Sequence, residues 1–210
     1  MWQPSFKNEL TKLSWSLKDK KALSDQIAAD IERTLEKELP PGYKAKAMKA
    51  KVPFMLSPMV EIDLQDAGGQ NPVKESLYGH NVSLTVKKKW FKPEYHIEAD
   101  SLYLKPEHRK KGIGKATMTS LIEAAKKSNV HSIGLEADGQ GKAVWSKIPG
   151  VEFANKAEVK HLHKAYKKWS TQHGGPSLSK NAKPSEYPSE FLLQYSPANL
   201  YLGYKLKIKD

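Results

Sequence analysis

Apolar residues recur at helical spacing over the first forty residues of the chain. They form two series over residues 2–17 and 23–35: Trp2, Phe6, Leu10, Leu13 and Leu17, then Leu23, Ile27, Ile31 and Leu35. Intervals of three and four place such side chains on one helix face. Two helices are therefore predicted, the second capped by Ser24 and ended by the sequence Pro40-Pro41-Gly42. The first stripe could also bind a membrane surface or a partner, but such a face usually packs on a core.

Beyond residue 52 the hydrophobic period changes from helical spacing to two. Residues 59–64, 82–86 and 95–104 alternate apolar and polar side chains, and residues 66–72 between the first two runs are rich in turn formers. Alternation of this kind is typical of strands with one buried face. Three strands are predicted, of which the first two are expected to pair antiparallel.

The second half of the chain continues the mixed pattern. It predicts helices, strands and one exposed loop in this order: helix 113–125, strand 131–137, helix 142–148, helix 155–169, exposed loop 172–189 and strand 200–208. This order is typical of an α/β fold with a mixed sheet. We expect residues 1–42 to be a helical segment that packs on one principal domain of residues 43–210.

Composition limits the functional classes. The chain has 210 residues, of which 39% are hydrophobic and 28% charged, with no run of 18 apolar residues and no apolar segment typical of a signal peptide. We therefore expect a cytoplasmic protein with no membrane span. Cysteine is absent from the sequence, which excludes disulfides, thiolate zinc ligands and an acyl-cysteine intermediate.

The formal net charge of +12 arises from 35 Lys and Arg against 23 Asp and Glu. A field of this sign favours anionic partners. The lysines gather in three clusters: Lys44, Lys46, Lys49 and Lys51; residues 87–89; and Lys205, Lys207 and Lys209. A nucleic acid or another acidic macromolecule is one expected partner, and a solvated lysine surface is the alternative.

The most informative segment is the glycine-containing turn at residues 109–114, which lies between a predicted strand and a predicted helix. Gly112 and Gly114 allow a ligand to approach the backbone, and the first amides of the helix lack intrahelical partners. The helix dipole and nearby basic side chains would favour a diphosphate there. A dinucleotide-binding turn is disfavoured because Thr117 stands where a third glycine is needed, and no P-loop Lys-Ser/Thr pair follows. A turn without a ligand remains the alternative.

Two segments resemble the cofactor motifs of the GNAT acetyltransferase superfamily. Residues 102–115, Leu-Tyr-Leu-Lys-Pro-Glu-His-Arg-Lys-Lys-Gly-Ile-Gly-Lys, resemble its strand, Gln/Arg-x-x-Gly-x-Gly/Ala turn and helix. Residues 140–153 are similar to its second motif, with Gln140 in place of asparagine and Trp145 in place of the usual tyrosine. The resemblance covers residues 95–153 and implies a GNAT-like mixed, mostly antiparallel twisted sheet flanked by helices, with acetyl-coenzyme A as co-substrate.

The same resemblance implies residue roles. Backbone amides of residues 109–114 would bind the diphosphate, residues 102–104 would pair with the pantetheine arm, and an amide at Leu102 would polarise the thioester carbonyl. The full set of expected cofactor contacts is Leu102, Tyr103, Leu104, Arg109, Lys110, Lys111, Gly112, Ile113, Gly114, Lys115, Gln140, Ala143 and Trp145.

An amine must lose a proton before it attacks a thioester, so a carboxylate base is expected. Glu98 is the candidate, because it lies eleven residues before Arg109, as in the histone-acetylating branch of the superfamily. Asp100, Glu61 and Asp63 are further carboxylates that could contribute, and a solvated Glu98 is the alternative. Since indole is no acid, the leaving thiolate would be protonated by solvent or by a hydroxyl, for which the candidates are Ser146, Tyr103, Tyr201 and Tyr204.

The sequence thus predicts an N-acetyltransferase that acts by direct attack of a primary amine in a ternary complex. The amine could belong to a protein or be linked to a nucleic acid. The alternatives are a catalytically inactive GNAT-fold protein that binds nucleic acid or acts as a scaffold, and, less favoured, a protein of the membrane surface. No metal site is expected, because His161 and His163 are two residues apart and point to different sides of a helix. A homodimer is left open.

Overall fold

The computed structural model describes residues 5–49, 59–66, 82–88, 94–99, 104–137, 139–195 and 202–208. Apart from the last two residues, the chain divides into two compact units, Met1–His131 and Ser132–Ile208, here called the N-unit and the C-unit. Helices and antiparallel strands occur in both units, so the predicted α/β class and mostly antiparallel pairing are confirmed. None of the described helices is long and apolar enough to cross a membrane.

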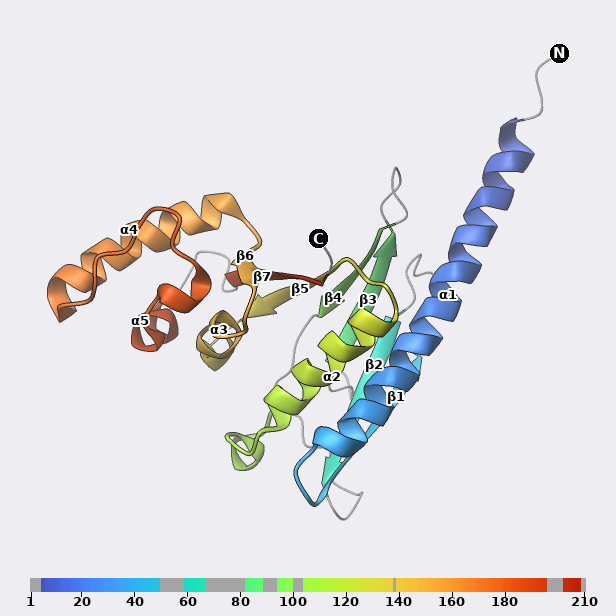
Figure 1. Cartoon of the computed structure of the whole chain (residues 1–210), viewed down its shortest axis with the longest axis horizontal. Helices are drawn as coiled ribbons and strands as arrows, with labels where there is room; N and C mark the ends of the chain where they lie inside the picture. Colours follow the sequence, from blue (N-terminus) through green and yellow to red (C-terminus); the bar gives the residue numbers. More distant parts are fainter. Residues whose placement is uncertain are drawn as a thin grey trace. The chain divides into compact units, whose positions relative to one another are not determined.

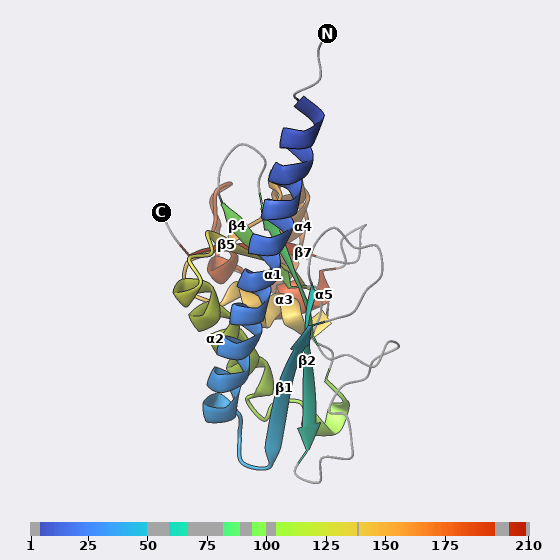
Figure 2. The same cartoon turned by 90° about the vertical axis from the view of Figure 1, so that its right-hand side faces the viewer.

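The N-unit consists of a four-stranded antiparallel meander and two long helices (Figure 1). Its elements are α1 (Ser5–Glu38), β1 (Tyr43–Lys49), β2 (Met59–Asp66), β3 (Val82–Lys88), β4 (Tyr95–Ala99), the 3-10 turn η1 (Pro106–His108) and α2 (Ile113–Lys127). Helices α1 and α2 lie side by side, and α1 contacts β1, β2 and β3. Figure 2 shows α1 in front of the strands.

One face of the meander is apolar and packs against the helices. Val60, Ile62 and Leu64 of β2 are fully buried, as the period-two pattern predicted, and so is Ile97 of β4. The opposite register positions, which include Glu61 and Glu98, therefore share the other face.

Helix α1 is one continuous helix, so the prediction of two helices with Ser24 as a cap is wrong. Ser24 lies inside the helix, fully buried, and its hydroxyl donates to the carbonyl of Lys20 at 2.9 Å. This back-bond satisfies the hydroxyl without ending the helix. No glycine or proline occurs between residues 5 and 38 to interrupt it. The predicted end before Pro40 is confirmed.

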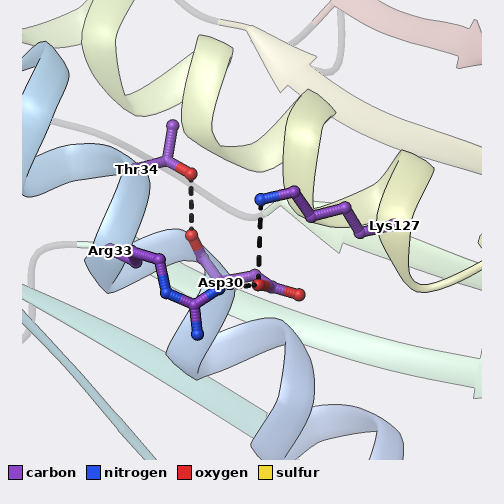
Figure 3. A network of polar contacts seen from close by, with 4 residues as sticks. All are labelled: Asp30, Arg33, Thr34 and Lys127. Atoms are coloured by element: carbon purple, nitrogen blue, oxygen red, sulfur yellow. Dashed lines mark hydrogen bonds and ion pairs between the residues drawn. The ribbon is translucent and has the colours of Figure 1, made fainter.

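A buried carboxylate connects α1 with α2. Asp30 is 6% exposed, and its Oδ1 lies 3.1 Å from Arg33 Nη1 on the same helix and 3.9 Å from Lys127 Nζ on α2 (Figure 3). Two cations therefore compensate a charge that burial would otherwise disfavour. A second carboxylate, Glu32, accepts a hydrogen bond from the amide of Ala47 at 3.1 Å and so links α1 to β1. Strand β1 in turn pairs with β2.

The C-unit is a three-stranded antiparallel arrangement with three helices. Its elements are β5 (Ser132–Ala137), α3 (Gly139–Ser146), β6 (Val151–Phe153), α4 (Lys156–His173), the 3-10 turn η2 (Pro184–Glu186), α5 (Ser189–Gln194) and β7 (Leu202–Lys207). Strand β7 pairs with both β5 and β6. Asn155 caps α4 by accepting the amide of Ala157 at 2.9 Å, and Gly174, at φ 70°, ends it.

The core of the C-unit is rich in tyrosine. Tyr166, Tyr187 and Tyr204 are at most 1% exposed, and Phe191 packs edge-on against Tyr166 at 5.1 Å between ring centroids. Burial requires partners for the hydroxyls, and Tyr204 donates to the carbonyl of Lys142 at 2.8 Å.

The segment 172–189 is largely exposed, as predicted, but three of its side chains are buried. These are Ala182, Pro184 and Tyr187, and the carbonyl of Pro176 accepts the Tyr166 hydroxyl at 2.6 Å. These contacts fix the segment to the aromatic core.

We expect Ile31→Ala in α1 to lower the free energy of unfolding by about 2–5 kcal/mol, because it leaves a cavity beneath a fully buried side chain. Glu36→Ala on the exposed face of the same helix is the control and should change it by less than about 0.5 kcal/mol. Urea denaturation followed by circular dichroism measures both, and equal effects would contradict the packing described for α1.

We expect Tyr204→Phe to lower the free energy of unfolding by about 1–2 kcal/mol, since the buried carbonyl of Lys142 loses its donor. Tyr195→Phe removes a hydroxyl that has no hydrogen-bond partner among the described residues, and it should be close to neutral. Chemical denaturation monitored by tyrosine and tryptophan fluorescence compares the two variants.

Candidate functional site

The candidate site is the segment that joins β4 to α2 in the N-unit. Leu104, half-buried, forms an isolated bridge, and η1 then turns the chain. The amide of His108 donates to the carbonyl of Lys105 at 2.9 Å, and that of Arg109 donates to Pro106 at 3.2 Å. The guanidinium of Arg109 donates a hydrogen bond from Nε to the carbonyl of Leu104 at 2.8 Å. These bonds hold the entrance to the glycine-containing loop.

Two residues of the loop have left-handed backbone conformations. Lys110 has φ 60°, and Gly112, the N-cap of α2, has φ 86° and ψ −4°. Only glycine adopts this region without strain, which explains why the motif needs it at position 112. A Cβ there would meet only Pro40 Cγ, at 3.9 Å, so the backbone angle rather than space excludes a side chain.

The N-terminus of α2 presents donors next to cations. The first intrahelical bond runs from the amide of Ala116 to the carbonyl of Gly112 at 2.9 Å, so the three amides before residue 116 have no intrahelical acceptor. Gly112 is exposed, Gly114 half-buried and Ile113 1% exposed. The basic side chains around them are exposed: Arg109, Lys110, Lys111 and Lys115. The helix dipole, these amides and these charges together favour an anion.

A pocket of about 540 Å³ adjoins this loop and was not predicted from the sequence. Tyr43 and His108 meet in its lining, with 3.1 Å from the hydroxyl to Nδ1, and Lys111 Nζ lies 5.9 Å from the centroid of the Tyr43 ring. Asp66 also lines the pocket, so a carboxylate opposes the ammonium group. No sequence signal brings Tyr43 and His108 together, because 65 positions separate them.

The candidate base, Glu98, lies on β4 opposite Thr85 of β3 and is half-buried. The register places Glu61 of β2 on the same face of the meander, opposite Ser83, and Asp63 two positions further along β2. Glu61 is 9% exposed. The structure thus gathers on one face three of the carboxylates considered from the sequence, while Asp100 lies outside the described residues.

Two further predicted contacts, Leu102 and Tyr103, also lie outside the described residues. Three of the predicted contacts belong to α3 of the C-unit: Gln140, Ala143 and Trp145. The structure describes the backbone of Gln140 but not its side chain. Helix α3 is fixed by Lys142, 4% exposed, whose ammonium group donates to the carbonyl of Tyr195.

Two candidates for the acid are internal to the C-unit. The hydroxyl of Ser146 is 1% exposed and donates to the carbonyl of Ala143 at 2.9 Å, so it is already used within α3. Tyr204 is fully buried, and burial raises the pKa of its phenol far above 10. Both groups therefore serve the fold, and the hypothesis that either protonates a leaving group is not supported. Tyr103 and Tyr201 lie outside the described residues.

Comparison with known proteins identifies the segment that contains this loop. Residues 82–145 match the family model described as acetyltransferase (GNAT) family. No curated protein matches the chain significantly in sequence. The match to the family model includes all of the first cofactor motif and the beginning of the second.

Solved acetyltransferases share low similarity with the chain. Nourseothricin acetyltransferase is 12% identical, with a TM-score of 0.37, and the match covers 73% of this chain and 66% of that one. A GNAT family acetyltransferase from Staphylococcus aureus Mu50 is also 12% identical, with a TM-score of 0.38, and the match covers 73% of this chain and 69% of that one. A GNAT family acetyltransferase from Elizabethkingia anophelis with acetyl-CoA bound is 8% identical, with a TM-score of 0.37, and the match covers 80% of this chain and 99% of that one. The chain thus spans just under two thirds of the first of these proteins.

The resemblance inferred from the motifs is confirmed by the family model. Residues 82–145 of the chain are thus similar to the acetyltransferase (GNAT) family, in agreement with the resemblance of the two motifs.

Proposed function

We propose that this chain is an acetyl-coenzyme A dependent N-acetyltransferase that acts on a primary amine. The observation that carries the proposal is the N-terminus of α2, where exposed Gly112 at φ 86° precedes three amides without intrahelical acceptors. Four exposed basic side chains flank these amides: Arg109, Lys110, Lys111 and Lys115. This donor set fits a diphosphate in both charge and hydrogen bonding.

The remaining cofactor contacts are part of the same proposal. Residues 102–104 would pair with the pantetheine arm, and the amide of Leu102 would stabilise the oxyanion that forms at the thioester carbonyl. Gln140, Ala143 and Trp145 of α3 would contribute the second motif. Within the proposed organisation, residues 43–210 form the acyltransferase domain and residues 1–42 form a helical segment that packs on it.

The reaction proposed is a direct transfer in a ternary complex. Glu98 accepts a proton from the ammonium form of the acceptor, directly or through water. The freed amine attacks the thioester carbonyl, which forms the C–N bond and the oxyanion. The nitrogen then loses its second proton to water, the oxyanion collapses, the C–S bond breaks and the thiolate leaves. Because Ser146 and Tyr204 are buried and engaged, water protonates the thiolate unless a residue outside the described chain does so. The acceptor amine could belong to a protein or be linked to a nucleic acid.

An inactive GNAT-fold protein that binds nucleic acid or acts as a scaffold is the second candidate. The specific observation in its favour is that α3 carries Trp145 at the place of the usual tyrosine, while the nearby hydroxyl of Ser146 is buried. The two candidates differ in whether acetyl-coenzyme A is bound and cleaved.

We expect wild-type protein to bind acetyl-coenzyme A with micromolar affinity in isothermal titration, and Gly112→Asp to weaken binding about tenfold or more. The substitution strains a left-handed position and places a negative charge at the proposed diphosphate site. Gly174→Asp is the matched control, because Gly174 also has positive φ, at 70°, but ends α4 in the C-unit. The absence of binding by wild-type protein, or equal losses in both variants, would remove the cofactor proposal.

We expect Glu98→Gln to lower turnover by about 100-fold or more near neutral pH, where most of the acceptor amine is protonated. The loss should shrink as pH rises toward the pKa of the amine, because free amine then needs no base. Asp63→Asn, on the same face of the meander, is the control. A pH–rate profile unchanged by Glu98→Gln would exclude this base, and a larger loss in Asp63→Asn would reassign it.

A further inference from the structure

A basic groove lies in the C-unit, outside the cofactor contacts proposed above. A groove of about 870 Å³ is lined by β6, by α4 and by the segment 180–184. Six lysines line it: Lys156, Lys160, Lys164, Lys167, Lys180 and Lys183. Four of them come from α4, and Lys156, Lys160 and Lys164 follow one another at about 6 Å along the helix axis.

The positive charge of the groove is not neutralised within the described chain. None of the six lysines forms an ion pair with another described residue. Glu152 is the one carboxylate in the lining, and it is engaged by Lys207 of β7 at 3.3 Å. Six neighbouring ammonium groups repel one another, so an anion in the groove would relieve this repulsion.

His163 adds an unused polar atom to the lining. It is 8% exposed, and its Nε2 is buried without a hydrogen-bond partner among the described residues. Its Nδ1 lies 3.4 Å from the hydroxyl of Tyr187. Burial, followed by the charges of Lys167 and Lys180, lowers the pKa of His163, so the ring is neutral at pH 7.

Tyr187 satisfies the other nitrogen of His163. Burial raises the pKa of Tyr187 to about 12, so its hydroxyl keeps its proton and can share a hydrogen bond with Nδ1 of the imidazole. In either tautomer, Nε2 has no hydrogen-bond partner among the described residues.

The walls of the groove are fixed before any ligand binds. Ala182 and Pro184 are buried, and Lys147 Nζ donates to the carbonyls of Ser185 and Tyr187 at 3.0 and 3.3 Å. The lining also has an apolar part that includes half-buried Phe153, whose ring stacks on Tyr204 with 25° between the ring planes. Because the walls are already ordered, a ligand that binds in this groove would cost the protein little conformational entropy.

We propose that this groove binds a single-stranded nucleic acid, with its lysines on successive phosphates and Phe153 against a base. Each lysine ammonium is a compact charge that binds a phosphate oxygen without a fixed planar geometry, and six of them line the groove. Basic grooves with aromatic contacts are the usual sites for single strands. This inference goes beyond the proposed acetyl transfer and depends on different residues.

The test is fluorescence anisotropy with a fluorescein-labelled 20-nucleotide oligouridylate and the full chain. Neutralisation of four to six phosphates predicts an affinity that falls about 50- to 300-fold between 50 and 200 mM salt. We expect the double variant Lys160→Glu/Lys167→Glu to bind at least about tenfold more weakly at 100 mM salt, with a shallower salt slope. The control Lys21→Glu/Lys168→Glu changes the net charge equally at exposed lysines outside the groove, and it should lose less than about threefold.

Competition and a fold check make each outcome decisive. Circular dichroism and acetyl-coenzyme A titration of both double variants establish that they are folded, and cofactor binding should be unchanged. Equal loss in the two variants, or no binding by wild-type protein, would overturn the proposal. Displacement of the oligonucleotide by equimolar AMP would indicate a mononucleotide site instead, and displacement by an equimolar polyglutamate peptide would indicate an acidic protein partner. Either result would also overturn it.

Discussion

The N-terminus of α2 must satisfy two opposed requirements within one turn. Ile113 is inside the core, at 1% exposure, while the amides of the same turn lack intrahelical acceptors at a helix end whose neighbouring residue Gly112 is exposed. The left-handed backbone at Gly112 resolves this conflict, since it redirects the chain immediately before the first buried residue. Burial of Ile113 and Ala116 then keeps the helix in place, so the donors are oriented before any ligand arrives.

The rest of the N-unit supports that helix. Helix α1 contacts α2 and the strands β1, β2 and β3, and its side chains Ile27, Ile31 and Leu35 are fully buried. Asp30 adds an ion pair with Lys127 of α2 at 3.9 Å, and Glu32 holds the amide of Ala47 on β1. Apolar burial supplies most of the stability of such an arrangement, and the two cations near Asp30 offset the cost of burying its charge.

Much of the fold could be predicted because hydrophobic periodicity and turn-forming residues are local signals in the sequence. The alternation in β2, the helix at α4 and the turn before α2 were all predicted from neighbouring residues. Strand β1 was missed because its pattern of Lys and Ala resembles a basic cluster, and Ser24 was misassigned because its partner, the carbonyl of Lys20, ends no helix. The short elements β6 and α5 are too brief to show a period.

The candidate site divides in the same way. The loop at residues 109–114 was predicted from glycine spacing and charge, whereas the meeting of Tyr43 with His108 depends on the tertiary fold. The lysine groove was also invisible in the sequence, because its lysines come from α4 and from a segment that composition described as a loop.

A ring stack connects the lysine groove to α3. Phe153 lines the groove with part of its ring and stacks on Tyr204, whose hydroxyl donates to the carbonyl of Lys142 inside α3. A substitution that changed the packing of this aromatic pair would therefore alter both the groove and the anchoring of α3. The two features are thus restricted in how independently they can evolve.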